Sequence, residues 1–152
     1  MKTFDLIKQY KIFEKDINKR VLKVLSSGSY ILGQNVKSFE NNARKYLATR
    51  YTVSCNSGTD ALVMSLRALN IGSNDQVITT PFTYFATSEA ISLVGAIPIF
   101  ADINPHTFNI NPKKIEKLIS KRTKAILSVN LFGQACELDK VSRIAKEYNL
   151  SH

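Results

Sequence analysis

One short segment of the chain, Ser57-Gly58-Thr59-Asp60, combines small and hydroxyl-bearing residues at the expected start of a helix. Gly58 lets the backbone approach a ligand closely. The amide groups of Gly58, Thr59 and Asp60 would point out of the helix N-terminus, with the Thr59 hydroxyl beside them, and such a group of donors suits a phosphate. The alternative is a capping box, with Ser57 as the cap and Asp60 three residues later.

Two further segments pair a turn with residues that could contact a ligand. In the first, Pro81 fixes a turn that presents Tyr84, and an aromatic ring held there could stack on a flat cofactor ring. Packing of that ring against a sheet is the alternative. In the second, a strand ends with a polar residue, a glycine and an amide, at Asn130, Gly133 and Gln134. A turn that binds no ligand is the alternative there.

The elements that would position these segments alternate between strand and helix, as the apolar spacing predicts. Strands are expected at 51–55, 76–80, 97–101 and 125–131, and helices at 10–25, 34–47, 57–69, 84–94, after Asn111-Pro112, and at 138–148. Strands that are apolar on both faces and separated by helices indicate a parallel sheet covered on both sides. The fold class is therefore α/β, and ligands are expected at the carboxyl ends of the strands.

The composition is that of a globular protein of 152 residues, with 21 basic and 12 acidic residues and a net charge of +9. Lysines and arginines punctuate apolar positions on two expected helices, which favours solvated helix faces over a nucleic-acid surface. No apolar run approaches the roughly 20 residues that span a bilayer. The N-terminal segment carries scattered charges, unlike a signal peptide, so a cytoplasmic protein with no membrane partner is expected.

The sulfur and imidazole side chains give little indication of a reactive or metal site. Cys55 and Cys136 lie far apart, outside any CxxC pattern and in or beside apolar stretches, so buried free thiols are expected. The two histidines, His106 and His152, are too few for the usual kind of metal site, and no metal ligand is assigned.

Taken in order, these segments resemble the DegT/DnrJ/StrS-type sugar aminotransferases, which are pyridoxal-phosphate enzymes of the aspartate aminotransferase fold. The resemblance extends over nearly the whole chain and rests on the order and spacing of several motifs. These are Tyr30-Ile31-Leu32-Gly33, Phe39-Glu40, Ser57-Gly58-Thr59-Asp60-Ala61-Leu62, Pro81, Thr83-Tyr84-Phe85-Ala86-Thr87, Gly95-Ala96-Ile97-Pro98, Asp102, Pro105, Thr107-Phe108-Asn109 and Asn130-Leu131-Phe132-Gly133-Gln134.

The resemblance implies a cofactor, substrates and site residues. The loop Ser57, Gly58, Thr59 and Asp60 would hold the phosphate of pyridoxal 5'-phosphate, Tyr84 would lie over its ring, and the loop that begins at Asn130 would line the active site. A histidine is commoner than asparagine at the position of Asn130. The implied reaction moves an amino group from glutamate to a keto group on a nucleotide-linked sugar, in a homodimer.

The resemblance also implies that essential parts lie beyond residue 152. An aspartate that holds the pyridinium nitrogen and the lysine that bonds the cofactor have no counterparts here, so no catalytic residue is assigned. Residues 1–33 are expected as an N-terminal helical segment, and 34–152 as the first part of a three-layer α/β/α cofactor-binding domain, truncated before its central strands. The implied strand order 3-2-4-5-6-7-1 would leave residues 125–131 as an open edge, and the isolated chain would be inactive and prone to aggregate.

Two functions from other classes remain as alternatives to an aminotransferase. The first is a non-catalytic module that binds phosphate or a sugar nucleotide with the same loop at residues 57–60. The second is a basic nucleic-acid-binding protein, for which steeply salt-dependent DNA binding would be required.

Overall fold

In the computed structural model, which describes residues 5–152, internal contacts divide the chain into two units that meet between Ser54 and Cys55. The division differs from the one drawn from the sequence, which separated residues 1–33 from 34–152. The helix at 34–47 therefore shares its contacts with the N-terminal unit.

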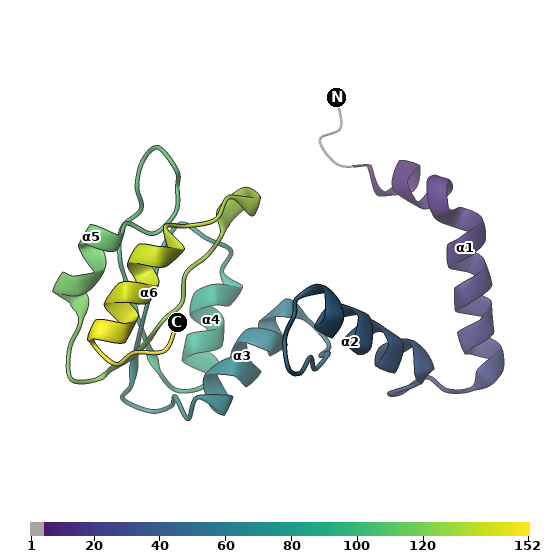
Figure 1. The fold of residues 1–152 in the computed structure, drawn as a ribbon, viewed down its shortest axis with the longest axis horizontal. Helices are drawn as coiled ribbons and strands as arrows, with labels where there is room; N and C mark the ends of the chain where they lie inside the picture. Colours follow the sequence, from purple (N-terminus) through teal and green to yellow (C-terminus); the bar gives the residue numbers. More distant parts are fainter. Residues whose placement is uncertain (1–4) are drawn as a thin grey trace. The chain divides into compact units, whose positions relative to one another are not determined.

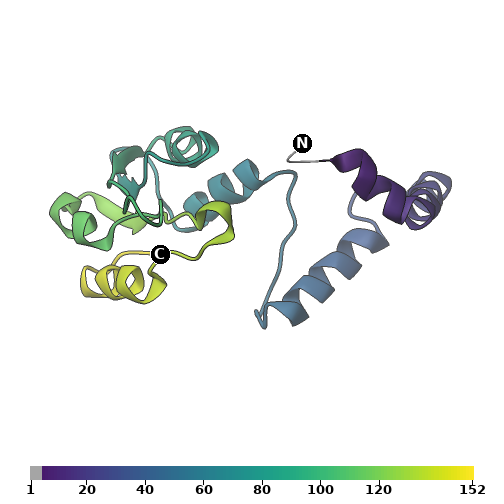
Figure 2. The same ribbon diagram turned by 90° about the horizontal axis from the view of Figure 1, so that it is seen from above.

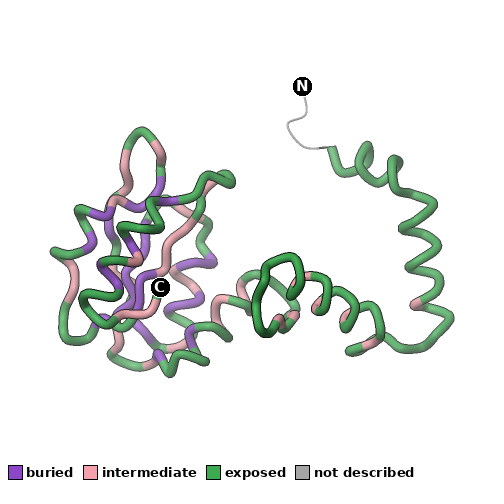
Figure 3. Tube along the Cα trace, viewed as in Figure 1, coloured by how far each residue is buried: buried purple, intermediate pink, exposed green. Residues whose placement is uncertain are grey.

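The N-terminal unit contains two helices, α1 (Leu6–Ser27) and α2 (Gln34–Tyr46), both shown in Figure 1. Helix α1 begins earlier than its apolar spacing predicts, because the Asp5 side chain accepts a hydrogen bond from the Lys8 amide and caps the helix. It ends at Gly28, whose φ of 67° is the left-handed conformation that glycine adopts without strain. The apolar side chains of both helices are exposed or half-buried (Figure 3).

The strand expected at residues 51–55 is wrong, because this segment has irregular backbone and forms no β-bridge. A strand needs a neighbour for its backbone groups, and no strand within residues 5–152 pairs with this one. Ser54 instead donates two hydrogen bonds to Glu40 Oε1, from its amide at 2.9 Å and its hydroxyl at 2.8 Å. These bonds, the amide's first, lower the pKa of Glu40 from its ordinary value.

We expect Glu40→Gln to remove a pH-dependent part of the stability of the N-terminal unit. The folded pKa of Glu40 is lowered, so its stabilising contribution is complete above the unfolded pKa and is lost as the pH falls through the folded pKa. Chemical denaturation of both proteins at a series of pH values should show less acid destabilisation in the variant. Glu14→Gln, which makes the same change at an exposed position of α1, is the matched control for the loss of one negative charge.

The second unit is built on a parallel sheet of three short strands, β1 (Gln76–Thr79), β2 (Ile97–Phe100) and β3 (Thr123–Ile126). Their order is β2-β1-β3, with both pairs parallel. The α/β class is thus confirmed. The order also agrees with the first three strands of the implied order 3-2-4-5-6-7-1, in which β2, β1 and β3 correspond to strands 3, 2 and 4. Helices lie on both sides of the sheet (Figure 2).

The expectation that β3 presents an open edge needs correction. Ser151 forms a parallel bridge with Ala125, since the Ile126 amide donates to the Ser151 carbonyl at 2.9 Å and the Ser151 amide donates to the Lys124 carbonyl at 3.0 Å. Ser151 therefore already pairs with this edge of β3 at one position. Its position agrees with the place of the next strand in the implied order.

Successive residues of β1 contribute to two separate cores, one on each face of the sheet. Val77 packs with residues of α3 (Gly58–Ala68) and α4 (Ala86–Leu93), whereas Ile78 packs with residues of α5 (Pro112–Ile115) and α6 (Leu138–Glu147). Both side chains are fully buried, and burial of each contributes about 1.5–3 kcal/mol. The apolar character of both faces of β1 is thereby explained.

Polar side chains mark both ends of β1. Gln76 is buried, and its Oε1 accepts a hydrogen bond of 2.6 Å from the Ser120 hydroxyl. Thr79 is buried too, and its hydroxyl donates to the Leu127 carbonyl at 2.8 Å. Every buried side-chain nitrogen and oxygen of the described residues has a hydrogen-bond partner, so hydrogen bonds within the protein replace those that these groups would make to water.

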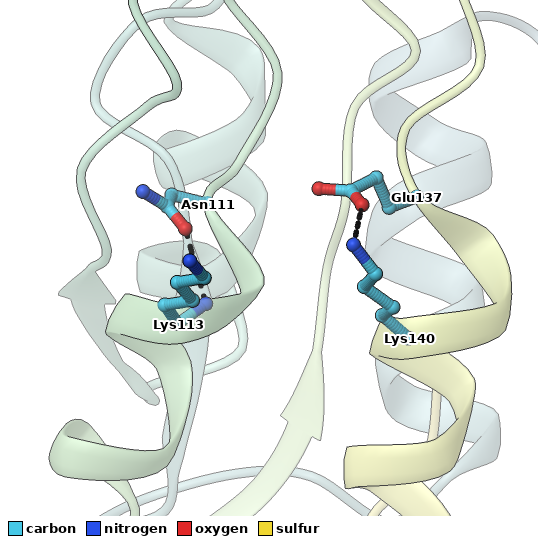
Figure 4. A network of polar contacts seen from close by, with 4 residues as sticks. All are labelled: Asn111, Lys113, Glu137 and Lys140. Atoms are coloured by element: carbon cyan, nitrogen blue, oxygen red, sulfur yellow. Dashed lines mark hydrogen bonds and ion pairs between the residues drawn. The ribbon is translucent and has the colours of Figure 1, made fainter.

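Several elements are shorter than their patterns predict. Strand β3 ends at Ile126 rather than at residue 131, and the chain then forms a 3-10 turn, η2 (Leu131–Gly133), in which Phe132 has a φ of 54°. Asn111 caps α5 through the Lys113 amide at 3.1 Å, with Pro112 in the first turn as expected, but α5 gives way to a 3-10 turn, η1 (Glu116–Leu118). Figure 4 shows this cap and the ion pair that joins Lys140 to Glu137 at the start of α6.

The expectation of two buried thiols holds for one of them. Cys136 is buried in the core beneath α6, whereas Cys55 is exposed, and both are free. Cys55 is exposed because it lies in the irregular segment after Ser54 and not in a buried strand. Among residues 5–152, no helix has the length and apolar character needed to cross a membrane.

Candidate functional site

The predicted ligand-contacting segments lie where the parallel sheet would place them. The chain leaves β1 toward Tyr84 and leaves β3 toward Asn130, and parallel strands end at one common edge. Helix α3 leads through a short turn into the start of β1, so its own first residues point toward the edge where β1 ends. This carboxyl edge is the usual ligand-binding edge of an open α/β sheet.

At the start of α3, the structure confirms a capping interaction. The Ser57 hydroxyl accepts a hydrogen bond of 3.1 Å from the Asp60 amide and donates one of 3.0 Å to Asp60 Oδ2. In a standard capping box, the carboxylate would accept instead from the backbone amide of Ser57. The Asp60 amide is therefore occupied by the cap, which corrects the expectation that it points outward as a third free donor.

Two donors remain at this helix end, beside open space. The amides of Gly58 and Thr59 make no hydrogen bond to any of residues 5–152. A Cβ atom built on Gly58 would meet no heavy atom within 4 Å. Helix α3 is 11 residues long, and its dipole favours negative charge at these amides. An anion can therefore be accommodated here without displacing any contact of the chain.

The second segment presents Tyr84 as an open ring. Tyr84 is 81% exposed, so the alternative in which it packs against the sheet is wrong. Its backbone is fixed, because its carbonyl accepts from the Thr87 amide at 3.1 Å and the hydroxyls of Thr83 and Thr87 lie 3.1 Å apart. The ring that packs in this loop is that of Phe82, whose centroid lies 5.6 Å from that of Phe108.

The third segment is held in place by two asparagines. Asn130 Oδ1 accepts a hydrogen bond of 2.9 Å from the Cys136 amide and so closes the loop on itself. Asn109 Oδ1 accepts one of 3.1 Å from the Leu131 amide, and Asn109 Nδ2 donates one of 3.0 Å to the Gln134 carbonyl. Because both Asn130 and Gln134 are exposed, this loop presents polar atoms to solvent.

The connection after β2 joins the second and third segments, through Phe108 on one side and Asn109 on the other. No hydrogen bond among the described residues joins either segment to Ser57–Asp60. No role was predicted for Asn109 from the sequence. The signal was present, since Thr107-Phe108-Asn109 is one of the motifs that carry the resemblance.

Comparison with solved structures defines the class of protein. An aminotransferase from Brucella abortus superposes with a TM-score of 0.94 at 37% identity, over 99% of this chain and 42% of that one. NtdA from Bacillus subtilis, solved with bound cofactor PMP, superposes with a TM-score of 0.87 at 38% identity, over 90% of this chain and 31% of that one. The fold is thus part of the aminotransferase fold.

Sequence comparison gives the family. The model of the DegT/DnrJ/EryC1/StrS aminotransferase family matches residues 11–151, and the chain belongs to that family. A relative from Pseudomonas aeruginosa, UDP-2-acetamido-2-deoxy-3-oxo-D-glucuronate aminotransferase, is 40% identical over 146 residues, which are 96% of this chain and 41% of that protein. The chain thus spans about two fifths of that relative's length.

We expect Ser57→Ala to destabilise α3, because the Asp60 amide loses its cap. Loss of such a cap costs about 1 kcal/mol in the free energy of unfolding. Ser65→Ala, an exposed position within the same helix, is the matched control and should cost nothing, since alanine has the higher helix propensity. Urea denaturation measures both, and equal midpoints would show that the cap does not contribute.

Proposed function

We propose that this chain supplies the phosphate-binding part of a pyridoxal-phosphate aminotransferase site, which transfers the amino group of glutamate to a keto group on a nucleotide-linked sugar. The observation that carries the proposal is the pair of unoccupied amides, Gly58 and Thr59, beside open space at the start of α3. Family membership supports the aminotransferase assignment, and the sugar nucleotide follows the printed activity of the Pseudomonas relative.

The residues present fit the cofactor. A phosphate would accept hydrogen bonds from the Gly58 and Thr59 amides and from the Thr59 hydroxyl, with the helix dipole favouring its charge. Ser57 and Asp60 would act by fixing the helix start, since each is bonded to the other. When bound, pyridoxal phosphate supplies an electron sink for the carbon that carries the amino group.

The other predicted residues would shape the space around the ring. Tyr84 offers an exposed face on a backbone held by the start of α4, which suits stacking on a flat ring. Asn130 uses its Oδ1 to hold the Cys136 amide, so its side-chain NH₂ group is the donor that would face the ligand.

Residues 1–152 alone would hold the cofactor without completing the transfer. The resemblance assigns the bonding lysine and the aspartate at the ring nitrogen to positions with no counterpart here. Lys124 cannot serve instead, because it lies near the start of β3 and so away from the carboxyl edge. A homodimer is proposed as the working assembly, and the exposed apolar side chains of α1 are consistent with burial against further protein.

The binding step can be tested on the chain with pyridoxamine phosphate, which has no aldehyde and so does not react with surface lysines. Fluorescence titration should show binding of pyridoxamine phosphate, competition by inorganic phosphate, and much weaker binding of pyridoxamine. Equal affinity for the phosphorylated and unphosphorylated probes would contradict the phosphate site. For the transfer step, a protein in which this chain is completed by the remaining segment of a family member should convert glutamate to 2-oxoglutarate only when a nucleotide-linked keto-sugar is supplied.

Two variants locate the phosphate. Gly58→Val should abolish binding of pyridoxamine phosphate, because a branched side chain would block close approach of the phosphate to the backbone. Thr59→Val should weaken binding by about 1.5–3 kcal/mol, the contribution of one hydrogen bond to a charged group. Gly72→Val is the control for Gly58→Val, as it makes the same change in the connection between α3 and β1, away from the start of α3.

The same titrations separate the alternatives. If Gly58→Val binds as well as Gly72→Val does, the start of α3 serves only as a helix cap. If the chain binds phosphate or a sugar nucleotide but discriminates against pyridoxamine phosphate, the non-catalytic binding module is the better description.

A further inference from the structure

The connection between β2 and α5 forms a short arch over residues 103–110. Ile103 and Ile110 pair as an antiparallel bridge at its base, and the Asn104 amide donates to the Asn109 carbonyl at 2.9 Å. Just after the turn, Phe108 has a φ of 59°, a conformation that residues other than glycine adopt at a cost. The arch therefore has a defined shape, maintained by its own backbone hydrogen bonds.

Asn109 is the residue through which this arch contacts the loop after β3. Its side chain is buried, at 3% exposure, and both of its polar atoms bond to backbone groups of that loop, the Leu131 amide and the Gln134 carbonyl. Only one orientation of the amide satisfies both partners, because the first is a donor and the second an acceptor. A single side chain thus fixes two points on either side of η2.

The other side of the arch contacts the loop after β1, since Phe108 packs against Phe82. Phe82 lies two residues before Tyr84. The arch consequently spans the two loops that present Tyr84 and Asn130, although it carries no residue assigned to the ligand.

We propose that Asn109 is a positioning residue that fixes the loop Asn130–Gln134 relative to the loop that carries Tyr84. Its two hydrogen bonds set the place of the loop, and the bond from the Cys136 amide to Asn130 then orients the Asn130 side chain. The consequence for a ligand rests on the proposed function. The consequence for the loop does not, because it follows from the contacts of Asn109 alone.

The first test measures the loop itself by amide hydrogen exchange. In Asn109→Leu, which keeps the γ-branched shape at a larger volume and removes both hydrogen bonds, the Leu131 and Cys136 amides should exchange about tenfold faster, while the amides of β1 are unchanged. Asn111→Ala is the matched control, because it removes a side-chain cap from the next element and leaves the loop untouched. Equal exchange at Leu131 in wild type and Asn109→Leu would overturn the proposal.

A second variant, Asn109→Asp, tests the proposal independently in case Asn109→Leu does not fold. Asn109→Asp keeps the shape and the acceptor for Leu131, but an ionised carboxylate cannot donate to the Gln134 carbonyl, and burial raises its pKa. The protonated acid can donate, so loop protection should approach that of wild type at low pH and fall as the pH rises through the raised pKa. Exchange rates of Asn109→Asp, corrected for the intrinsic pH dependence, that do not change over this range would count against the proposal.

The ligand consequence is measured with pyridoxamine phosphate. Asn109→Leu should raise its dissociation constant at least about tenfold, and Asn111→Ala should leave it unchanged. A loosened loop with unaltered affinity would reduce Asn109 to a structural residue and overturn its role at the site. If wild type binds no pyridoxamine phosphate, the proposed function fails, while the exchange experiment still decides whether Asn109 positions the loop.

Discussion

Strand β1 is hydrogen-bonded along both edges and buried on both faces, and the second unit is organised around this condition. Its backbone groups are satisfied by β2 on one side and β3 on the other, which leaves its side chains free to be apolar in both directions. Helices must then cover both faces, and α3 and α4 do so on one face while α5 and α6 do so on the other. The parallel arrangement brings the ends of all three strands to one edge, where the loops with exposed polar and aromatic residues begin.

Much of this arrangement could be predicted from sequence, because strand and helix follow from apolar spacing that short-range geometry enforces. The parallel sheet, the helix order and the cap at Asn111 are of this kind. The strand expected at residues 51–55 failed for a different reason, since a strand is defined by its partner and a local pattern cannot supply one. The exposure of Cys55 follows from the same cause.

The residue types of the candidate site could be predicted from the sequence, but the hydrogen bonds that hold these residues could not. Motif order pointed to Ser57–Asp60, Tyr84 and Asn130, and the structure places them on the start of α3 and on loops at the carboxyl edge. It left open whether the Asp60 amide is taken by Ser57 or points outward, because this depends on one side-chain rotamer. Nor could it assign Asn109, whose two partners lie 22 and 25 residues away in sequence and meet it only in the folded unit.

The polar residues at the two ends of β1 determine its alignment in the sheet, which its apolar residues do not determine. Val77 and Ile78 are nearly interchangeable in size and polarity, so a shift of the strand by one residue would still bury an aliphatic side chain on each face. Gln76 and Thr79 remove this degeneracy, because their bonds to Ser120 and to the Leu127 carbonyl are satisfied in one alignment only. A slipped strand would leave both groups buried without partners, at about 1–3 kcal/mol each. Two hydrogen bonds thus fix the alignment of β1 in the sheet, and the loops that follow β1 and β3 take their relative positions from that alignment.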